Sequence, residues 1–297
     1  MNILLTGANG QLGTELQRIL DSGQAEIGPI PSVYADACVT CTDVGDLDIT
    51  CRQAVLDFVA QGCFDLIVNC AAMTNVDGCE AAEEAAFSVN ASGPENLAIA
   101  ARQTGAKLVQ VSTDYVFAGT EARPRVEADA VGPVSAYGRS KLAGERAVAR
   151  ECERFFIVRT AWLYGYVGKN FVKTMLRLGA SHDSVTVVDD QLGNPTSAND
   201  LAYSILRIAE GEDYGIYHCT NEGTCSWADF AQAIMECGGL DCRVERCTSA
   251  QYKQMNPASA TRPAYSSLEN AHLAETCGNQ MRPWRQALGN FFQNYGS

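Results

Sequence analysis

The stretch MNILLTGANGQLGTELQRIL (1–20) carries the strongest indication of the fold of this chain. It opens with a short apolar run over 2–6 that ends at a glycine cluster. The residues that follow, 11–21, carry leucine and isoleucine at the spacing of one helical face. The stretch therefore predicts a strand, a tight turn and a helix at the start of the chain.

Three glycines, Gly7, Gly10 and Gly13, lie between that strand and that helix. In such a turn the first glycine permits the tight bend, the second lets the backbone approach a pyrophosphate, and the third allows close packing of helix on strand. The helix N-terminus adds oriented N–H groups and the positive end of a dipole. A glycine triplet also occurs in purely structural turns, but in this strand, turn and helix context it indicates dinucleotide binding.

Three further apolar runs, 65–71, 107–112 and 155–160, lack alternating polar residues. Strands of this kind are buried on both faces, which is typical of a parallel sheet covered by helices. Helix candidates over 80–104 and 135–150 lie between these runs and continue the alternation. The expected fold class is therefore α/β, with a Rossmann-like doubly wound parallel sheet.

Beyond about residue 160 the pattern loosens into turns rich in glycine and polar residues. Two helix-like runs, 226–237 and 283–294, stand among loops rich in Thr, Ser, Asn and Pro. No repeat, low-complexity tract or proline-rich linker marks a clean boundary. We therefore expect residues 1–160 to form an NAD(P)-binding Rossmann domain to which later segments return. Residues 161–297 should form mainly a smaller, interwoven substrate-binding lobe.

The formal net charge of −13 argues against binding to nucleic acid or to an anionic membrane, because both rely on summed positive charge. The N-terminus has neither the basic start nor the long apolar core of a signal peptide, and no run reaches the roughly 18 apolar residues of a membrane span. These features predict a cytoplasmic protein. The 13 cysteines are typical of a reduced chain, and the CxxC at 38–41 is interpreted as loop or strand rather than as a metal or redox motif.

The choice between the two nicotinamide dinucleotides depends on charge near the end of the second strand. A 2′-phosphate needs a basic residue there, and a free 2′-hydroxyl needs an acid. No Lys or Arg lies between Arg18 and Arg52, which argues against strict NADP specificity, although Arg18 could reach back. Asp48 and Ile49 would contact the adenine, or Asp48 would instead cap a helix. The acids Asp36, Asp43, Asp46 and Asp48 all lie in the same interval.

The stretch STDYVF (112–117) ends a buried strand on polar residues, among them Thr113. At the carboxyl edge of a doubly wound sheet, a threonine hydroxyl can donate a hydrogen bond to a carbonyl oxygen that is becoming an alkoxide. One strand–helix unit later, Tyr137 and Lys141 stand at i and i+4 on one helical face. A lysine beside a phenol lowers the pKa of the phenol, so the tyrosine can exchange a proton with a carbinol oxygen, and the lysine can also bond a nicotinamide ribose. The alternatives are a turn-starting hydroxyl and an exposed helix pair.

The glycine turn and the Thr, Tyr and Lys set resemble the extended short-chain dehydrogenase/reductase superfamily. The chain is similar, over residues 1 to about 270, to the dTDP-4-dehydrorhamnose reductase family in blocks such as NCAAMTNVDGCE, STDYVFAGT, AYGRSKLAGE, RTAWLYG, DDQLGNPT and ATRPAYSSL. The resemblance implies a Rossmann lobe and a smaller substrate lobe. It also implies that NADPH or NADH reduces the C4 keto group of dTDP-4-dehydro-L-rhamnose, a dTDP-linked 4-keto-6-deoxy sugar, to give dTDP-L-rhamnose.

The resemblance also assigns roles to residues by position. The catalytic set would be Thr113, Tyr137 and Lys141. Cofactor contacts would come from Gly7, Asn9, Gly10, Gln11, Leu12, Gly13, Asp48, Ile49, Ala71, Ala72, Thr74, Tyr137 and Lys141. Substrate contacts would come from Thr113, Asp114, Tyr115, Trp162, Asn170, Thr196 and Arg262.

Three of the implied roles rest on one side chain each. Trp162 would pack its indole face against a pyranose, or would serve as core packing. Arg262 would be the best local phosphate clamp in an acidic chain. Mg²⁺ would be bound partly through Glu15 in the first helix, at a subunit contact of a homodimer rather than at the chemistry.

The chain departs from the family pattern in two places, and two rival functions stay open. The segment before 46–50 lacks an obvious second strand, and the end of the chain matches family ends only loosely. A sugar-nucleotide dehydratase is disfavoured, because such enzymes carry an Asp-Glu pair after the threonine and here Tyr115 follows Asp114. A nucleotide-sugar epimerase of the same superfamily is an alternative. So is a non-catalytic regulatory subunit resembling that of methionine adenosyltransferase, against which the intact catalytic set argues.

Overall fold

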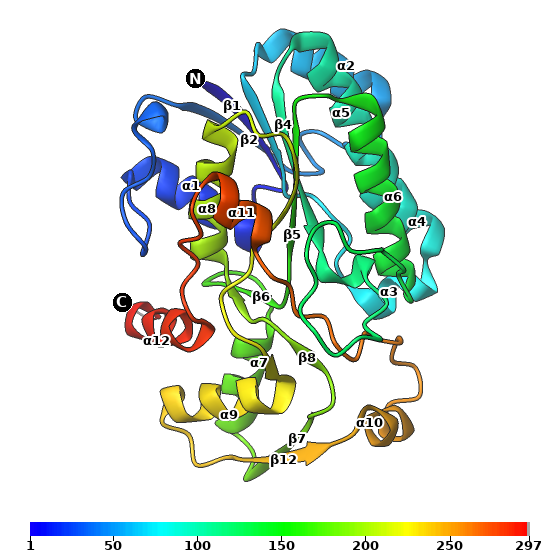
Figure 1. Cartoon of the computed structure of the whole chain (residues 1–297), viewed down its shortest axis with the longest axis vertical. Coiled ribbons are helices and arrows are strands. Elements are labelled where there is room, and N and C mark those ends of the chain that lie inside the picture. Colours follow the sequence, from blue (N-terminus) through cyan, green and yellow to red (C-terminus); the bar gives the residue numbers. More distant parts are fainter. Residues whose placement is uncertain (296–297) are drawn as a thin grey trace.

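The structure is a computed structural model that describes residues 1–295. Within these residues a six-stranded sheet has the order β10-β5-β4-β3-β1-β2, and all its strands run parallel (Figure 1). The chain passes from β1 to β2 on one side and then to β3 on the other, so the strand order reverses beside β1. The strands are β1 (Asn2–Thr6), β2 (Cys38–Thr42), β3 (Leu66–Asn69), β4 (Lys107–Thr113), β5 (Phe155–Thr160) and β10 (Gly215–His218).

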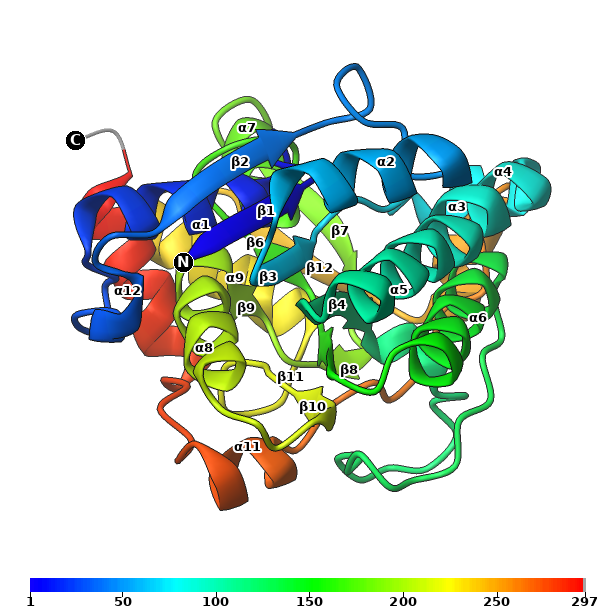
Figure 2. The ribbon, with the colours of Figure 1, turned by 90° about the horizontal axis from the view of Figure 1, so that it is seen from above.

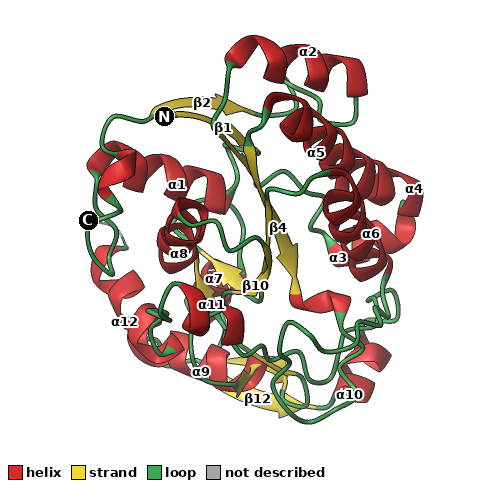
Figure 3. Cartoon of the chain, turned by 45° about the horizontal axis from the view of Figure 1, so that its top comes forward, coloured by secondary structure: helices red, strands yellow, loops and turns green. Residues whose placement is uncertain are grey.

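Helices cover both faces of the sheet, so the sheet is the middle of three layers (Figure 2; Figure 3). One face is covered by α1 (Gln11–Ser22) and α8 (Ala198–Glu210). The other is covered by α2 (Arg52–Gly62), α5 (Gly93–Thr104) and α6 (Ala136–Glu151). The predicted α/β fold with a Rossmann-like doubly wound sheet is confirmed.

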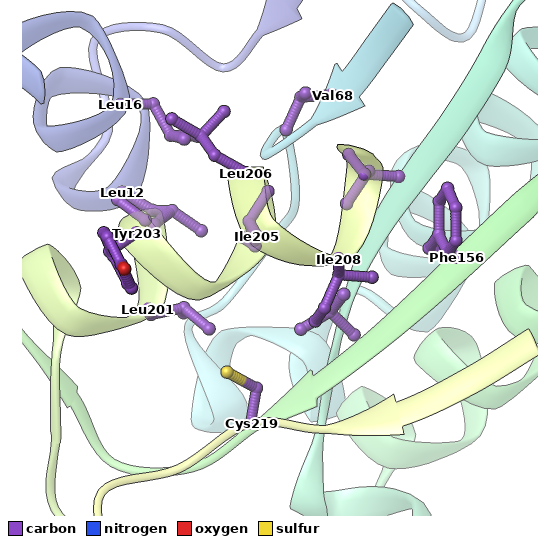
Figure 4. Packing of buried hydrophobic residues seen from close by; sticks show 14 of the residues in the cluster. Leu12, Leu16, Val68, Phe156, Leu201, Tyr203, Ile205, Leu206, Ile208 and Cys219 are labelled. Atoms are coloured by element: carbon purple, nitrogen blue, oxygen red, sulfur yellow. The ribbon is translucent and has the colours of Figure 1, made fainter. Parts of the chain in front are cut away.

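The core between α1, α8 and the sheet joins distant parts of the sequence. Leu16 of α1, Leu206 of α8 and Val68 of β3 are all buried in one cluster, which Figure 4 shows from close by. Burying an aliphatic side chain of this size stabilises the fold by about 1.5–3 kcal/mol. Because α8 lies beyond residue 160, a later segment supplies one of the two helices that cover this face of the sheet.

The helix expected over 80–104 is interrupted in the structure. Asn90 lies in a π-helical turn, where its side chain accepts a hydrogen bond from Met73 N at 2.8 Å and donates one to Met73 O at 3.0 Å. This side chain therefore holds the loop that follows β3. The helical periodicity of the sequence does not indicate this contact. The pieces are α3 (Val76–Ala81), α4 (Glu83–Phe87), the π-helical turn (Ser88–Ser92) and α5.

The second strand, for which the sequence offers no clear signal, is β2 at the edge of the sheet. It pairs only with β1, and its partly exposed residues form no continuous apolar run. Cys38 and Cys41 are both exposed. Because successive residues of a strand point to opposite faces, side chains three positions apart leave from opposite sides. The CxxC is therefore a strand segment, one of the two interpretations expected.

The smaller lobe lies below the sheet in Figure 1 and has its own apolar core. Both helix-like runs expected there are helices, α9 (Trp227–Gly238) and α12 (Trp284–Asn294). They pack with α7 (Phe171–Gly179) and with the parallel pair β7 (Ser184–Val188) and β12 (Arg243–Cys247). The short elements are β6 (Leu163–Tyr164), β8 (Leu192–Gly193), β9 (Thr196–Ser197), β11 (Cys225–Ser226), α10 (Ser249–Met255), α11 (Ala271–Thr276) and the 3₁₀ turns Ser32–Tyr34 and Asp114–Val116.

None of the helices within residues 1–295 combines the length and the apolar content that a bilayer crossing needs.

The glycine turn packs so closely on its neighbours that a side chain has no room. Gly7 has φ +67°, and a Cβ there would lie 2.5 Å from Ala71 N in the loop after β3. A Cβ on Gly13 would lie 2.4 Å from Gly7 O. These contacts bring the N-terminus of α1 against the carboxyl ends of β1 and β3.

We expect Gly7→Ala to destabilise the protein far more than Gly23→Ala. Both glycines have positive φ, but a Cβ on Gly23 would meet no other atom within 4 Å. The loss of stability in Gly23→Ala therefore comes only from the strain of placing an alanine at positive φ. The expected losses in the free energy of unfolding are about 1–2 kcal/mol for Gly23→Ala and roughly 2–5 kcal/mol for Gly7→Ala, because overpacking adds to the strain. Urea denaturation of both variants measures the difference, and equal losses would contradict it.

Candidate functional site

A cavity of about 460 Å³, here called the central cavity, opens where β4 and β5 end. Residues of the glycine turn, of the strand ends, of the start of α6 and of the smaller lobe line it. Ligands of doubly wound folds bind at this edge of the sheet. The predicted site residues on its walls are Gly10, Gln11, Leu12, Gly13, Ala72, Thr74, Thr113, Asp114, Tyr115, Tyr137, Lys141 and Trp162.

Thr113 is the last residue of β4, and its hydroxyl takes part in a local network. Thr113 Oγ1 donates a hydrogen bond to Asp114 Oδ1 at 2.9 Å and accepts one from Tyr115 N at 3.2 Å. Both Thr113 and Asp114 are buried. The hydroxyl therefore lies at the cavity wall, within reach of both the Asp114 carboxylate and the Tyr137 phenol.

Tyr137 reaches the same wall because α6 begins very close to the segment after β4. Ser135 caps the helix by accepting a hydrogen bond from Gly138 N at 3.1 Å. A Cβ on Gly138 would lie 2.2 Å from Tyr115 O, so only glycine allows this approach. The rings of Tyr137 and Tyr115 then meet edge to face, with their centroids 5.5 Å apart.

Lys141 lies one helical turn after Tyr137 and is 3% exposed. Its Nζ donates a hydrogen bond to Val111 O of β4 at 2.7 Å. Behind it, Glu145 and Arg159 form a buried ion pair at 2.7 Å, and Ser112 also donates to Glu145. This pair is not among the residues predicted above, although Glu145 occupies position i+4 from Lys141 on the same helical face.

Burial shifts the pKa values of the ionisable groups on this wall. Burial raises the pKa of Tyr137 above its usual value, while a hydrogen bond with Thr113 opposes the shift. This direction differs from the lowered pKa expected from a neighbouring ammonium, because desolvation of the phenolate outweighs other influences. Burial lowers the pKa of Lys141 to about 8, and the carboxylate of Glu145 works against that change. At neutral pH Tyr137 is therefore a protonated phenol.

A second cavity of about 370 Å³, here called the glycine-turn cavity, adjoins the central cavity. Gly7, Gly10, Ala71 and Ala72 line it together with Asp48 and Ile49, so the structure brings these predicted residues to one place. Asp48 also accepts hydrogen bonds from Thr50 N and Thr50 Oγ1, which lower its pKa. It thus stabilises the turn before α2 and faces the cavity as well. Asn9 is exposed beside this cavity, and its N–H donates to Asp43 at 3.3 Å.

A third cavity of about 430 Å³, here called the C-terminal cavity, lies in the smaller lobe and shares Trp227 with the central cavity. The indoles of Trp162 and Trp227 stack with a centroid distance of 3.5 Å and an interplanar angle of 9°. Trp162 has φ +47°, and a Cβ on Gly193 would lie 2.5 Å from its ring. Trp227 is not among the predicted residues. The Ser226 and Asp229 capping box marks its place in the first turn of α9.

Three predicted substrate residues lie at different distances from these cavities. Arg262 lines the C-terminal cavity, and its guanidinium pairs with Asp77 of α3 at 3.3 Å. Asn170 uses its amide to cap α7 and to donate to Gln11 at 2.8 Å. Thr196 is fully buried and donates to Asn194 O. The structure therefore brings Arg262 to a cavity but directs the side chains of Asn170 and Thr196 into intramolecular contacts.

The Mg²⁺ site expected at Glu15 is not supported. Glu15 is 1% exposed and accepts a hydrogen bond from Asn199 at 3.0 Å, and Arg18 pairs with it at 3.1 Å. Among residues 1–295 no group of three His, Cys, Asp or Glu side chains gathers in a geometry that could hold a metal ion. Glu15 is therefore a buried residue that links α1 to α8.

Comparison with known proteins gives consistent matches along the whole chain. The family described as the RmlD substrate binding domain matches residues 1–297. The dTDP-4-dehydrorhamnose reductase of Streptomyces griseus is 42% identical over 296 residues, which covers 97% of this chain and 92% of that protein. The spore coat polysaccharide biosynthesis protein SpsK of Bacillus subtilis is 37% identical over 295 residues, covering 99% and 98%.

Solved structures match equally well. The dTDP-4-dehydrorhamnose reductase ortholog of Clostridium acetobutylicum superposes with a TM-score of 0.91 at 46% identity and covers 99% of each chain. The dTDP-4-dehydrorhamnose reductase of Bacillus anthracis, solved in complex with NADP, superposes with a TM-score of 0.91 at 38% identity and covers 98% of each chain.

The buried carboxyl of Asp114 should make the stability of the protein depend on pH. Burial raises its pKa to about 6, against a usual value near 4. As pH rises, the carboxyl of Asp114 therefore loses its proton in the unfolded chain before it does so in the folded protein. The free energy of unfolding is unaffected by this group below about pH 4 and is lowered by roughly 2–3 kcal/mol above about pH 6. Asp114→Asn should gain stability relative to the wild type as pH rises through this window, with a plateau above it. Urea unfolding at several pH values checks this, and a constant difference from pH 4 to 8 would contradict it.

Proposed function

Since this chain belongs to the RmlD substrate binding domain family, we propose that it reduces the C4 keto group of a dTDP-linked 4-keto-6-deoxy sugar, dTDP-4-dehydro-L-rhamnose, to give dTDP-L-rhamnose. The family makes the chain an NAD(P)-dependent oxidoreductase of nucleotide-sugar and polysaccharide biosynthesis. The membership of this family, which the sequence resemblance predicted, is therefore confirmed. The reduction of this particular sugar is supported by one observation. Thr113, Tyr137 and Lys141 lie together on the wall of the central cavity, beside the glycine turn.

The residues around the glycine turn fit a nicotinamide dinucleotide. Helix α1 has no side chain at its N-cap, so the N–H groups of Gln11, Leu12 and Gly13 have no intrahelical acceptor and can donate to a pyrophosphate. Gly7 and Gly10 line the glycine-turn cavity and bring no side chain into it. When bound there, NADPH or NADH would supply the hydride that the carbonyl carbon accepts.

Tyr137 would act as the general acid of the reduction. Its raised pKa keeps the phenol protonated at neutral pH, which is the form needed to give a proton to the carbonyl oxygen. The Thr113 hydroxyl, turned from Asp114 toward that oxygen, would donate a hydrogen bond to the developing alkoxide. The ammonium of Lys141, held by Val111 O, would stabilise the phenolate that Tyr137 leaves behind.

The C-terminal cavity would take the nucleotide end of the substrate. It shares Trp227 with the central cavity, and this indole would offer a flat face to a sugar or a base. Arg262 lies on its wall and would exchange its pairing with Asp77 for the diphosphate. The relatives named dTDP-4-dehydrorhamnose reductase support this substrate, whereas the relative SpsK, at 37% identity, makes other 4-keto sugar nucleotides worth testing.

The deciding experiment follows the absorbance of NADH and NADPH at 340 nm with dTDP-4-dehydro-L-rhamnose generated by coupled upstream enzymes. Loss of absorbance that depends on this substrate supports the proposal. A protein that binds the dinucleotide but consumes neither form would instead be an epimerase or a regulatory subunit. A panel of other 4-keto nucleotide sugars, tested at the same concentrations, identifies a different substrate.

Removal of one hydroxyl group tests the role of Tyr137. Tyr137→Phe should lower kcat by about 10²–10⁴-fold, because the ring remains but the proton donor is gone. Its affinity for the dinucleotide, measured by fluorescence titration, should stay near that of the wild type. Tyr203→Phe is the matched control. Tyr203 lies in α8, away from the cavity, and its hydroxyl donates a hydrogen bond to Gln280 at 2.8 Å. Unchanged turnover in Tyr137→Phe would exclude the assignment.

A further inference from the structure

The end of β2 carries a carboxylate that the function proposed above does not use. Asp43 follows Thr42, the last residue of β2, which pairs in register with Thr6 immediately before the glycine turn. Ala8 N donates to Thr42 O at 3.1 Å, so the end of β2 is fastened to the turn. Asp43 lines the glycine-turn cavity at this point. In doubly wound folds the residue at this place faces the ribose of the adenosine.

The hydrogen bonds of Asp43 hold its carboxylate in place and leave part of it free. One oxygen accepts from Val44 N at 2.8 Å, and the other accepts from Asn9 N at 3.3 Å. Each carboxylate oxygen has two acceptor sites, so each can accept one further hydrogen bond. The two hydroxyls of an unmodified ribose would supply these donors.

A 2′-phosphate would meet only negative charge in this cavity. Asp43 and Asp48 both line it, and no Lys or Arg does among residues 1–295. Arg18, the cation that could have reached back from α1, pairs with Glu15 and lines a different cavity. Arg52 pairs with Glu95 and donates to Asn96 at 2.9 Å, so the start of α2 supplies no cation either.

We propose that this chain selects NADH over NADPH, and that Asp43 is the residue that sets the preference. Its carboxylate would accept hydrogen bonds from the adenosine ribose of NADH and would repel the 2′-phosphate of NADPH. This inference rests on the proposed function only in requiring a nicotinamide dinucleotide at the glycine turn. It adds a cofactor preference that the glycine motif itself does not decide.

Direct binding tests the preference without any sugar substrate. NADH and NADPH carry the same fluorescent nicotinamide, so titration of each against the full-length wild-type protein yields two comparable Kd values. We expect NADH to bind at least about tenfold more tightly, since one strong charged contact corresponds to a factor of this order. Equal binding, or tighter binding of NADPH, overturns the inference while leaving the proposed reduction intact. Binding of neither dinucleotide overturns both.

Asp43→Asn assigns the effect to this residue. The amide keeps the shape of the side chain but removes its charge, so the ratio of the NADPH Kd to the NADH Kd should fall on the order of tenfold. Asp36→Asn is the matched control, because Asp36 is an exposed acid of the same segment and lines none of the cavities described above. Circular dichroism and thermal unfolding establish that both variants are folded. An unchanged ratio in Asp43→Asn, or an equal change in Asp36→Asn, overturns the role of Asp43.

Discussion

The Gly7 turn packs directly on the backbone at Ala71, and this contact sets the geometry of the cavities on both sides of it. A Cβ at Gly7 would lie 2.5 Å from Ala71 N, and one at Gly13 would lie 2.4 Å from Gly7 O, so three backbone segments meet with no side chain between them. This approach leaves the N-terminus of α1 open at the carboxyl edge of the sheet. Both the glycine-turn cavity and the central cavity include Gly10 in their walls, so the absence of side chains at the turn creates space on either side of it.

A second close approach, of α6 to the segment after β4, forms the opposite wall and has an electrostatic cost. Burial disfavours the charged forms of Asp114 and Lys141, whose pKa values move to about 6 and about 8. The carboxylate of Glu145 favours the charged lysine, and it is itself paired with Arg159, both members of this ion pair being about 3% exposed. The site is thus a locally destabilising arrangement, held in place by the well-packed cores on both faces of the sheet.

The central cavity belongs to neither lobe alone, because residues of both form its walls. The stack of Trp162 on Trp227 joins the segment after β5 to the start of α9. Arg282, from the chain end, pairs with Glu26 at 3.0 Å and donates to Asp200 at 2.9 Å, so it ties the smaller lobe to α8 and to the loop after α1. The site should therefore form only when the two lobes fold together, which explains why no flexible linker separates them in the sequence.

Residue order was enough to predict the parallel sheet, the glycine turn and the Thr113, Tyr137 and Lys141 set, because each depends on strand and helix periodicity or on spacing within a short segment. It did not reveal β2, whose edge position leaves no apolar run, or the break at Asn90, which depends on a side chain reaching a distant loop. Three further features emerge only from the folded chain: Trp227 lines the central cavity, desolvation raises the pKa of Tyr137, and Glu15 accepts a hydrogen bond from Asn199 of α8. They depend on how closely elements pack in three dimensions, which the periodicity and spacing of residues along the chain do not specify.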